Sequence, residues 1–146
     1  MLRRAVVVAA CVLVVVFGLQ SPSMADEDYY FECSKDWSVC QTGVKVAGPQ
    51  GVCMTAIDTQ NTQVCVDYDG DYVYVRDGQA DGYAAQAGID YTSTVLHRHC
   101  RNNHGYGTWA RCNFDWNESE TKLVRGGFKY NYDLIMLENL WTFANN

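Results

Sequence analysis

The chain has 146 residues and a formal net charge of −6. Its first 25 residues have the pattern of an export signal, so a mature chain of 121 residues remains, which is the size of one domain. Arg3 and Arg4 leave with this signal, and the net charge of the mature chain is then −8. Such a charge excludes a general binder of nucleic acid or of anionic membranes, since either partner requires a positive surface.

Residues 1–25 are predicted to be a secretory signal peptide. The two arginines form a basic start, residues 5–19 are an unbroken apolar run, and Ser23 and Ala25 are small residues suited to a cleavage site. The apolar run is shorter than the ~20 residues needed to cross the hydrocarbon core of a membrane. We therefore expect a secreted, extracellular protein with no membrane association after the signal is cleaved.

Residues 26–31 (Asp-Glu-Asp-Tyr-Tyr-Phe) stand apart as three acids followed by three aromatic residues. Two interpretations are open for residues 26–32. They form either an edge strand of the domain's own sheet or an extended arm that docks on a partner, with Tyr29, Tyr30 and Phe31 as anchors. Residues 33–146 are then a single disulfide-rich β domain.

Six cysteines remain after Cys11 leaves with the signal: Cys33, Cys40, Cys53, Cys65, Cys100 and Cys112. Six thiols in a small exported domain predict three disulfides. The local pairs 33–40, 53–65 and 100–112 are favoured, because each pair flanks one turn-rich segment and would clip one hairpin. A zinc site is disfavoured because no Cys-x-x-Cys motif occurs.

Short alternating runs of apolar residues recur about every 10 to 12 residues, and no long segment keeps a helical period. This pattern predicts an all-β fold, a small antiparallel sandwich or barrel of about seven or eight strands. Five strands of the C-terminal half are predicted at residues 83–89, 94–101, 108–116, 122–129 and 134–143. Within the last of these, residues 134–140 fit a short helix as well.

The strongest local pattern is a hairpin formed by residues 64–68 and 71–75. The dipeptide between them, Asp69-Gly70, suits the positive φ angles of a type I′ turn. Because side chains alternate across a strand, Tyr72 and Tyr74 are expected on the face opposite the core. The sequence therefore predicts an exposed tyrosine face that a partner could bind.

All three histidines lie within eight residues, at His97, His99 and His104. On a strand, His97 and His99 share a face, which suits metal binding or acid–base chemistry with Glu118 or Glu120, as in small secreted ribonucleases. A solvated strand face is the more common origin of such a run. Cys100 and Cys112 are expected to be oxidised, and no hydrolase, phosphate-loop or metalloprotease motif occurs.

Three alternating acids, Asp67, Asp69 and Asp71, have the spacing of the first calcium ligands of an EF-hand. Position 6 of that loop is then Tyr72 instead of Gly, and position 12 is Gly78 instead of Glu, so the motif fails. A looser calcium site shared with Asp77 and Asp81 is the remaining alternative. We expect no metal and no cofactor.

Residues 69–77, 80–82, 100–102 and 105–115 together resemble small secreted proteins of actinomycetes. The sequences are Asp-Gly-Asp-Tyr-Val-Tyr-Val-Arg-Asp, Ala-Asp-Gly, Cys-Arg-Asn and Gly-Tyr-Gly-Thr-Trp-Ala-Arg-Cys-Asn-Phe-Asp. Among these proteins the chain looks most like the small adaptor subunit of the umbrella toxin particles, which are antibacterial. In those particles, adaptors join a large repeat-containing subunit to lectin-like subunits that choose the target cell.

This resemblance implies a non-catalytic protein with two binding surfaces, for which the sequence offers the 26–31 arm and the tyrosine face. Residues 26–90 have a net charge of −9 and residues 91–146 a net charge of +1, which suits either oriented docking to a partner or an acidic hairpin edge that discourages sheet-to-sheet aggregation. Two alternatives use the same exposed features. One is a monomeric carbohydrate- or cell-wall-binding module, and the other is an inhibitor that presents the loop at residues 102–107 to an exported hydrolase.

Overall fold

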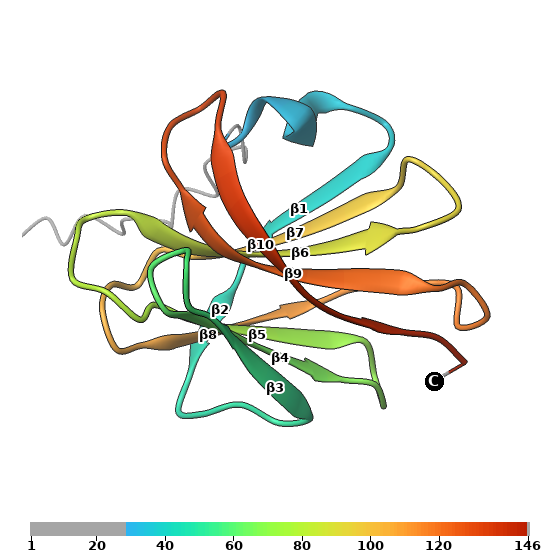
Figure 1. Cartoon of the computed structure of the whole chain (residues 1–146), viewed down its shortest axis with the longest axis horizontal. Helices are drawn as coiled ribbons and strands as arrows, with labels where there is room; N and C mark the ends of the chain where they lie inside the picture. Colours follow the sequence, from blue (N-terminus) through green and yellow to red (C-terminus); the bar gives the residue numbers. More distant parts are fainter. Residues whose placement is uncertain (1–28, 146) are drawn as a thin grey trace, which may run out of the picture.

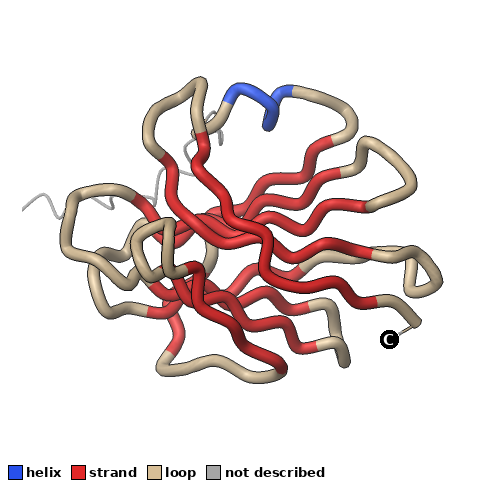
Figure 2. Tube along the Cα trace, in the orientation of Figure 1, coloured by secondary structure: helices blue, strands red, loops and turns tan. Residues whose placement is uncertain are grey.

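The computed structural model describes residues 29–145, so the predicted signal peptide and Asp26, Glu27 and Asp28 lie outside the described residues. Within the described part, ten strands and one turn of 3₁₀ helix make up the regular structure (Figures 1 and 2). The elements are η1 (Phe31–Ser34), β1 (Ser38–Thr42), β2 (Val44–Val46), β3 (Val52–Ala56), β4 (Thr62–Asp67), β5 (Tyr72–Arg76), β6 (Ala84–Tyr91), β7 (His97–Asn102), β8 (Trp109–Asn113), β9 (Lys122–Lys129) and β10 (Ile135–Phe143). No helix among residues 29–145 is long and apolar enough to span a membrane.

The strands form two five-stranded sheets that stack as two layers (Figure 1). The first sheet has the order β1-β7-β6-β9-β10, and the second has the order β2-β8-β5-β4-β3. Every neighbouring pair is antiparallel except β1 and β7, which are parallel. The prediction of an all-β sandwich is confirmed.

The strand number is higher than predicted because three strands precede residue 62. The alternation of buried and exposed residues that marks a strand is missing there: in β3, four consecutive residues are exposed before the buried Ala56. The last predicted segment, residues 134–143, is strand β10 from Ile135 onward, so its helical interpretation is wrong.

Gly43 lets the chain pass from the first sheet to the second between β1 and β2. Its N–H donates to the Arg101 carbonyl in β7 at 2.9 Å, and a Cβ on Gly43 would lie only 2.9 Å from the Ala110 Cβ in β8. The absence of a side chain therefore permits one continuous segment to supply an edge strand to each layer.

The core lies between the two layers and consists mainly of small β-branched and aromatic side chains. Its fully buried members include Val64, Val66, Val73, Val75, Ala87, Ile89 and Val124. They occupy alternate positions on their strands, which is the pattern expected when one face of each sheet is buried.

The three disulfides join the predicted pairs 33–40, 53–65 and 100–112. Only one of these pairs clips a hairpin as predicted: Cys53 and Cys65 face each other across the β3–β4 hairpin. Cys100 lies in the first sheet and Cys112 in the second, and both are buried at 1% exposure, so this disulfide joins the two layers. The remaining bond fixes η1 to β1.

The β4–β5 hairpin forms as predicted, but its turn is not of type I′. Asp67 pairs with Tyr72, which leaves a four-residue loop at 68–71 with positive φ at Gly70 and Asp71. The Asp71 carboxylate accepts a hydrogen bond from the Trp116 N–H at 3.1 Å, and its carbonyl accepts one from Phe114 at 3.0 Å. These contacts with the chain after β8 hold the wider turn.

Candidate functional site

The sandwich has two ends that differ in their side chains. At the end we call the closed end, the loops 68–71, 92–96 and 114–121 connect strands. At the opposite end, the open end, lie the loops 77–83, 103–108 and 130–134. The candidate functional residues lie at these two ends and on the outer faces of the sheets.

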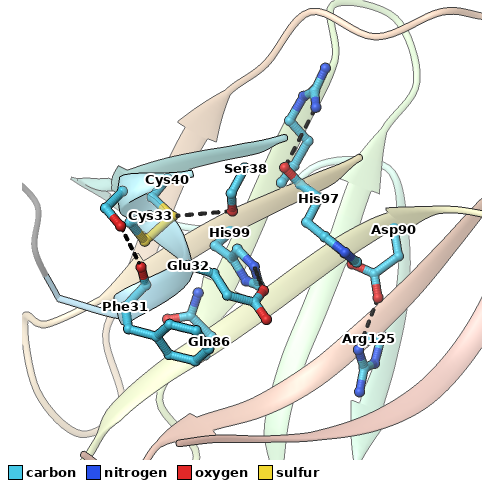
Figure 3. Close-up of polar contacts among 12 residues, drawn as sticks. Phe31, Glu32, Cys33, Ser38, Cys40, Gln86, Asp90, His97, His99 and Arg125 are labelled. Atoms are coloured by element: carbon cyan, nitrogen blue, oxygen red, sulfur yellow. Dashed lines mark hydrogen bonds and ion pairs between the residues drawn. A yellow bond between two sulfur atoms is a disulfide. The ribbon is translucent and has the colours of Figure 1, made fainter. Parts of the chain in front are cut away.

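A chain of polar side chains crosses the outer face of the first sheet (Figure 3). His97 Nδ1 lies 2.8 Å from one carboxylate oxygen of Asp90, and the other oxygen accepts a hydrogen bond from Arg125 Nη1 at 2.9 Å. An Nδ1–H that donates to Asp90 leaves Nε2 of His97 as the basic atom of the ring. The arrangement resembles the orienting half of a His–Asp catalytic pair.

His99 lies on the same face but is buried beneath the N-terminal segment (Figure 3). The Tyr29 hydroxyl donates to the His99 carbonyl at 3.1 Å, and the Tyr30 ring packs edge-on against the imidazole at 5.4 Å. Glu32 reaches to 3.9 Å from His99 Nε2, and neither ring nitrogen has a hydrogen-bond partner within residues 29–145. Burial lowers the pKa of His99 to about 4, although the Asp90 carboxylate opposes this shift.

The predicted histidine cluster is only partly brought together. His97 and His99 share a face as expected, with ring centroids 6.1 Å apart, whereas His104 Nε2 lies 2.8 Å from the Gly43 carbonyl at the open end. The carboxylate beside His97 is Asp90, not Glu118 or Glu120. Asp90 could have been found from the sequence, because it pairs with His97 across the β6–β7 hairpin.

The aspartates proposed as calcium ligands do not converge. Asp67 accepts the Asp69 N–H, Asp71 accepts the Trp116 N–H, and both contacts are local features of the closed end. Among residues 29–145, no group of three or more His, Cys, Asp or Glu side chains is arranged to hold a metal ion.

The predicted exposure of Tyr72 and Tyr74 is wrong. Tyr74 is only 3% exposed, and the Arg111 guanidinium covers the half-buried Tyr72 ring at 4.7 Å from its centroid. Alternation along the strand correctly put both side chains on the face opposite the core. It did not show that Arg111 and the neighbouring strands would cover that face.

The N-terminal aromatic residues are neither a free arm nor an edge strand. Tyr29 is 4% exposed, with the Arg101 guanidinium 4.2 Å from its ring centroid, so it cannot anchor a partner in this structure. Tyr30 is half-buried. Its burial is the main cause that raises the pKa of its hydroxyl, and the nearby Glu32 carboxylate raises this pKa further. Of these three aromatic residues only Phe31 is exposed, at 37%. It is the first residue of the 3₁₀ turn η1, which the Cys33–Cys40 disulfide joins to β1.

An apolar surface joins Phe31 to the β9–β10 hairpin at the open end. The Phe31 N–H donates to the Tyr132 carbonyl at 3.1 Å, and η1 lies beside this hairpin in Figure 1. We call the exposed side chains here the hairpin surface: Phe31, Tyr130, Tyr132, Leu134 and Met136. This surface could not be predicted from the sequence, because the two segments are about 100 positions apart and meet only in the folded chain.

A pocket of about 250 Å³ opens between the loops 77–83 and 103–108. Its lining includes Asp77, Gln79, Asp81, Tyr83, Asn103 and Tyr106. Burial raises the pKa of Asp77, and the nearby Asp81 carboxylate raises it further. Asp77 and Asp81 thus line one pocket, away from Asp67 and Asp71, with which the looser calcium site would have joined them.

No protein-family model matches the chain, and neither a curated protein nor a solved structure matches it.

Proposed function

We propose that the protein is a secreted, non-catalytic adaptor that joins two other extracellular proteins. The observation that carries the proposal is the hairpin surface: five large apolar side chains are exposed on two distant segments, which meet where the Phe31 N–H donates to the Tyr132 carbonyl. Exposed apolar side chains that gather in one place mark interaction sites on soluble proteins. The three disulfides are compatible with an extracellular protein.

The edge strand β3 is the second docking surface of the proposed adaptor. It pairs with β4 on one side, and on the described chain its other edge has no strand partner. Val52 and Met54 on this strand are 48% and 44% exposed. An exposed edge with apolar side chains can pair with an added strand of another protein, and its alternate side chains then enter pockets of that partner.

The resemblance of residues 64–116 to the umbrella toxin adaptors suggests the two partners. One is a large repeat-containing subunit, and the other is a lectin-like targeting subunit of an antibacterial particle that acts in competition between bacteria. The strongly negative N-terminal half would orient the chain on a partner with a positive surface.

The experiment is to tag the mature protein at its C-terminus, recover it from its native culture medium without denaturant, and identify the proteins that accompany it by mass spectrometry. The expected result is stoichiometric recovery of two different secreted proteins. Recovery of a lone monomer would contradict the proposal. A one-to-one complex with an exported hydrolase would favour the inhibitor instead.

Three variants assign the surfaces within this experiment. Tyr132→Ser with Leu134→Ser is expected to remove one partner, and Met54→Lys is expected to remove the other. Val95→Ser is the matched control, because Val95 is 67% exposed but lies at the closed end. If Val95→Ser removes a partner as efficiently as the hairpin variant, the hairpin surface is not the docking site.

A further inference from the structure

The pocket at the open end is held in shape by hydrogen bonds between its two loops. The Asp77 N–H donates to the Thr108 carbonyl at 3.3 Å, and the Gly107 N–H donates to the Asp77 carbonyl at 2.9 Å. The buried amide of Asn102 donates to Val75 and to Thr108 at 3.0 and 2.8 Å. The loops are therefore fixed to each other and to β5, so a ligand would meet a preformed pocket.

The polar atoms of the pocket favour a ligand that donates hydrogen bonds. Asp77 and Asp81 each use one carboxylate oxygen to accept a backbone N–H, from Gln79 at 3.1 Å and from Tyr83 at 2.8 Å. The second oxygen of Asp81 is buried and has no partner among residues 29–145. Ionised carboxylates only accept hydrogen bonds, and an unpaired buried acceptor is costly.

The charge of the pocket excludes anionic ligands. Two carboxylates line it, and neither lysine nor arginine is among its lining residues. A phosphate, a sulfate or a uronic acid would be repelled. The exposed amides of Gln79 and Asn103 at the rim can both donate and accept, as a ligand with several hydroxyl groups requires.

Two tyrosines give the pocket apolar walls. Tyr83 is packed against Phe128 and Tyr130, with ring centroids 5.4 Å from each. Tyr106 is 62% exposed and stands between Gly105 and Gly107, whose φ angles of 90° and 75° set the sharp turn. A large exposed ring on a constrained loop loses little entropy when a flat apolar face stacks on it.

We propose that this pocket binds a saccharide that is uncharged or carries an amino group. Sugar hydroxyls can donate hydrogen bonds to the Asp77 and Asp81 carboxylates that line the pocket, and the C–H face of a sugar ring matches the exposed ring of Tyr106. The volume of about 250 Å³ is small for a drug-sized ligand and suits one or two sugar units. A calcium ion fits less well, because it needs six to eight oxygen ligands and only two carboxylates line the pocket.

Saturation-transfer NMR on the secreted, disulfide-bonded protein tests this proposal. The probes are trimers of N-acetylglucosamine, of glucosamine and of glucose, with a galacturonic acid trimer as the anionic probe. We expect transfer to the ring protons of at least one uncharged or amino trimer and none to the galacturonic acid trimer. The proposal is overturned if no uncharged or amino trimer receives saturation.

Variants then locate the binding, with affinity measured by calorimetry. Tyr106→Ala is expected to weaken binding about tenfold, Asp81→Asn to weaken it comparably, and Tyr106→Phe to retain it. The control is Tyr132→Ala, which lies on the hairpin surface and is expected to bind the sugar as the parent protein does. Unchanged affinity in Tyr106→Ala, or binding that disappears with a calcium chelator, would overturn the proposal. Because Tyr132 belongs to the proposed protein-docking surface, sugar binding and protein docking can fail independently.

Discussion

The two ends of the sandwich use the same kinds of residue in opposite ways. At the closed end, Lys122 is fully buried and its ammonium lies 5.0 Å from the ring centroid of Phe143, 5.9 Å from that of Trp116 and 6.0 Å from that of Tyr91. All three rings are buried as well. At the open end, Tyr106, Tyr130 and Tyr132 are exposed.

This difference between the two ends indicates that residues at the closed end stabilise the fold and residues at the open end are available for binding. At the closed end the buried ammonium of Lys122 is paired internally, since its Nζ donates to the carbonyls of Glu118 at 3.4 Å and Glu120 at 2.9 Å. The open end instead leaves the side chains of Tyr106, Tyr130 and Tyr132 in contact with solvent. Substitutions at the closed end should therefore affect folding, and those at the open end should affect binding.

The largest effect is expected for Lys122→Ala. Burial among the rings lowers the pKa of Lys122, and truncation would leave a cavity and two carbonyls without their donor. We expect a loss of about 4 kcal/mol in the free energy of unfolding, measured by urea denaturation. Lys122→Met keeps the packing volume and should lose only about 1 kcal/mol.

The matched control for this substitution is Lys129→Ala, at the open end of the same strand β9. Lys129 is half-buried, so its truncation should change the free energy of unfolding by only about 0.5 kcal/mol. Equal losses at both ends of β9 would contradict the assignment of stability to the closed end.

Acid is expected to lower the free energy of unfolding through His99, which lies beneath the N-terminal segment. The unfolded chain binds a proton at His99 near its ordinary pKa of 6.5, whereas the folded chain resists protonation down to about 4. Stability is therefore complete above pH 6.5 and falls between pH 6.5 and 4, by about 3 kcal/mol in total. The measurement is urea unfolding across this range, compared with His99→Gln.

His99→Gln removes the titrating group while keeping a side chain of similar size. Its unfolding free energy should vary less with pH between 6.5 and 4 than that of the parent protein. If the two curves run parallel through this window, the acid sensitivity belongs to other groups.

A smaller effect is expected for Asp71→Ala in the closed-end loop. The substitution removes the acceptor for the Trp116 N–H and puts alanine at a φ of 57°, which aspartate tolerates better. We expect a loss of about 2 kcal/mol in thermal or urea unfolding. Asp69→Ala, exposed in the same loop, should change stability by no more than about 0.5 kcal/mol.

Local pattern was enough to predict much of the fold. The bounds predicted for residues 122–129 agree with β9, because alternating side chains mark a strand whose one face is buried. The disulfide pairs were also predicted, although Cys100 and Cys112 join two layers that no local pattern reveals. The parallel pairing of β1 with β7 likewise depends on contacts distant in sequence.

The candidate sites were less accessible from sequence for the same reason. The burial of Tyr74, the approach of Phe31 to Tyr132 and the pocket between Tyr83 and Tyr106 all result from segments that meet only in the folded chain. Alternation indicates which face a side chain takes, but it does not indicate what covers that face.

The smallest effects on stability are expected at the open end. Tyr106→Ser and Tyr132→Ser should each change the free energy of unfolding by no more than about 0.5 kcal/mol, because both side chains are exposed on loops. Tyr130→Ser should cost about 1 kcal/mol, since this ring packs on Tyr83 at 5.4 Å. Urea unfolding of the three variants checks this order. A loss in Tyr132→Ser as large as that in Asp71→Ala would mean that the hairpin surface is part of the folding core, and the separation between a stabilising end and a binding end would fail.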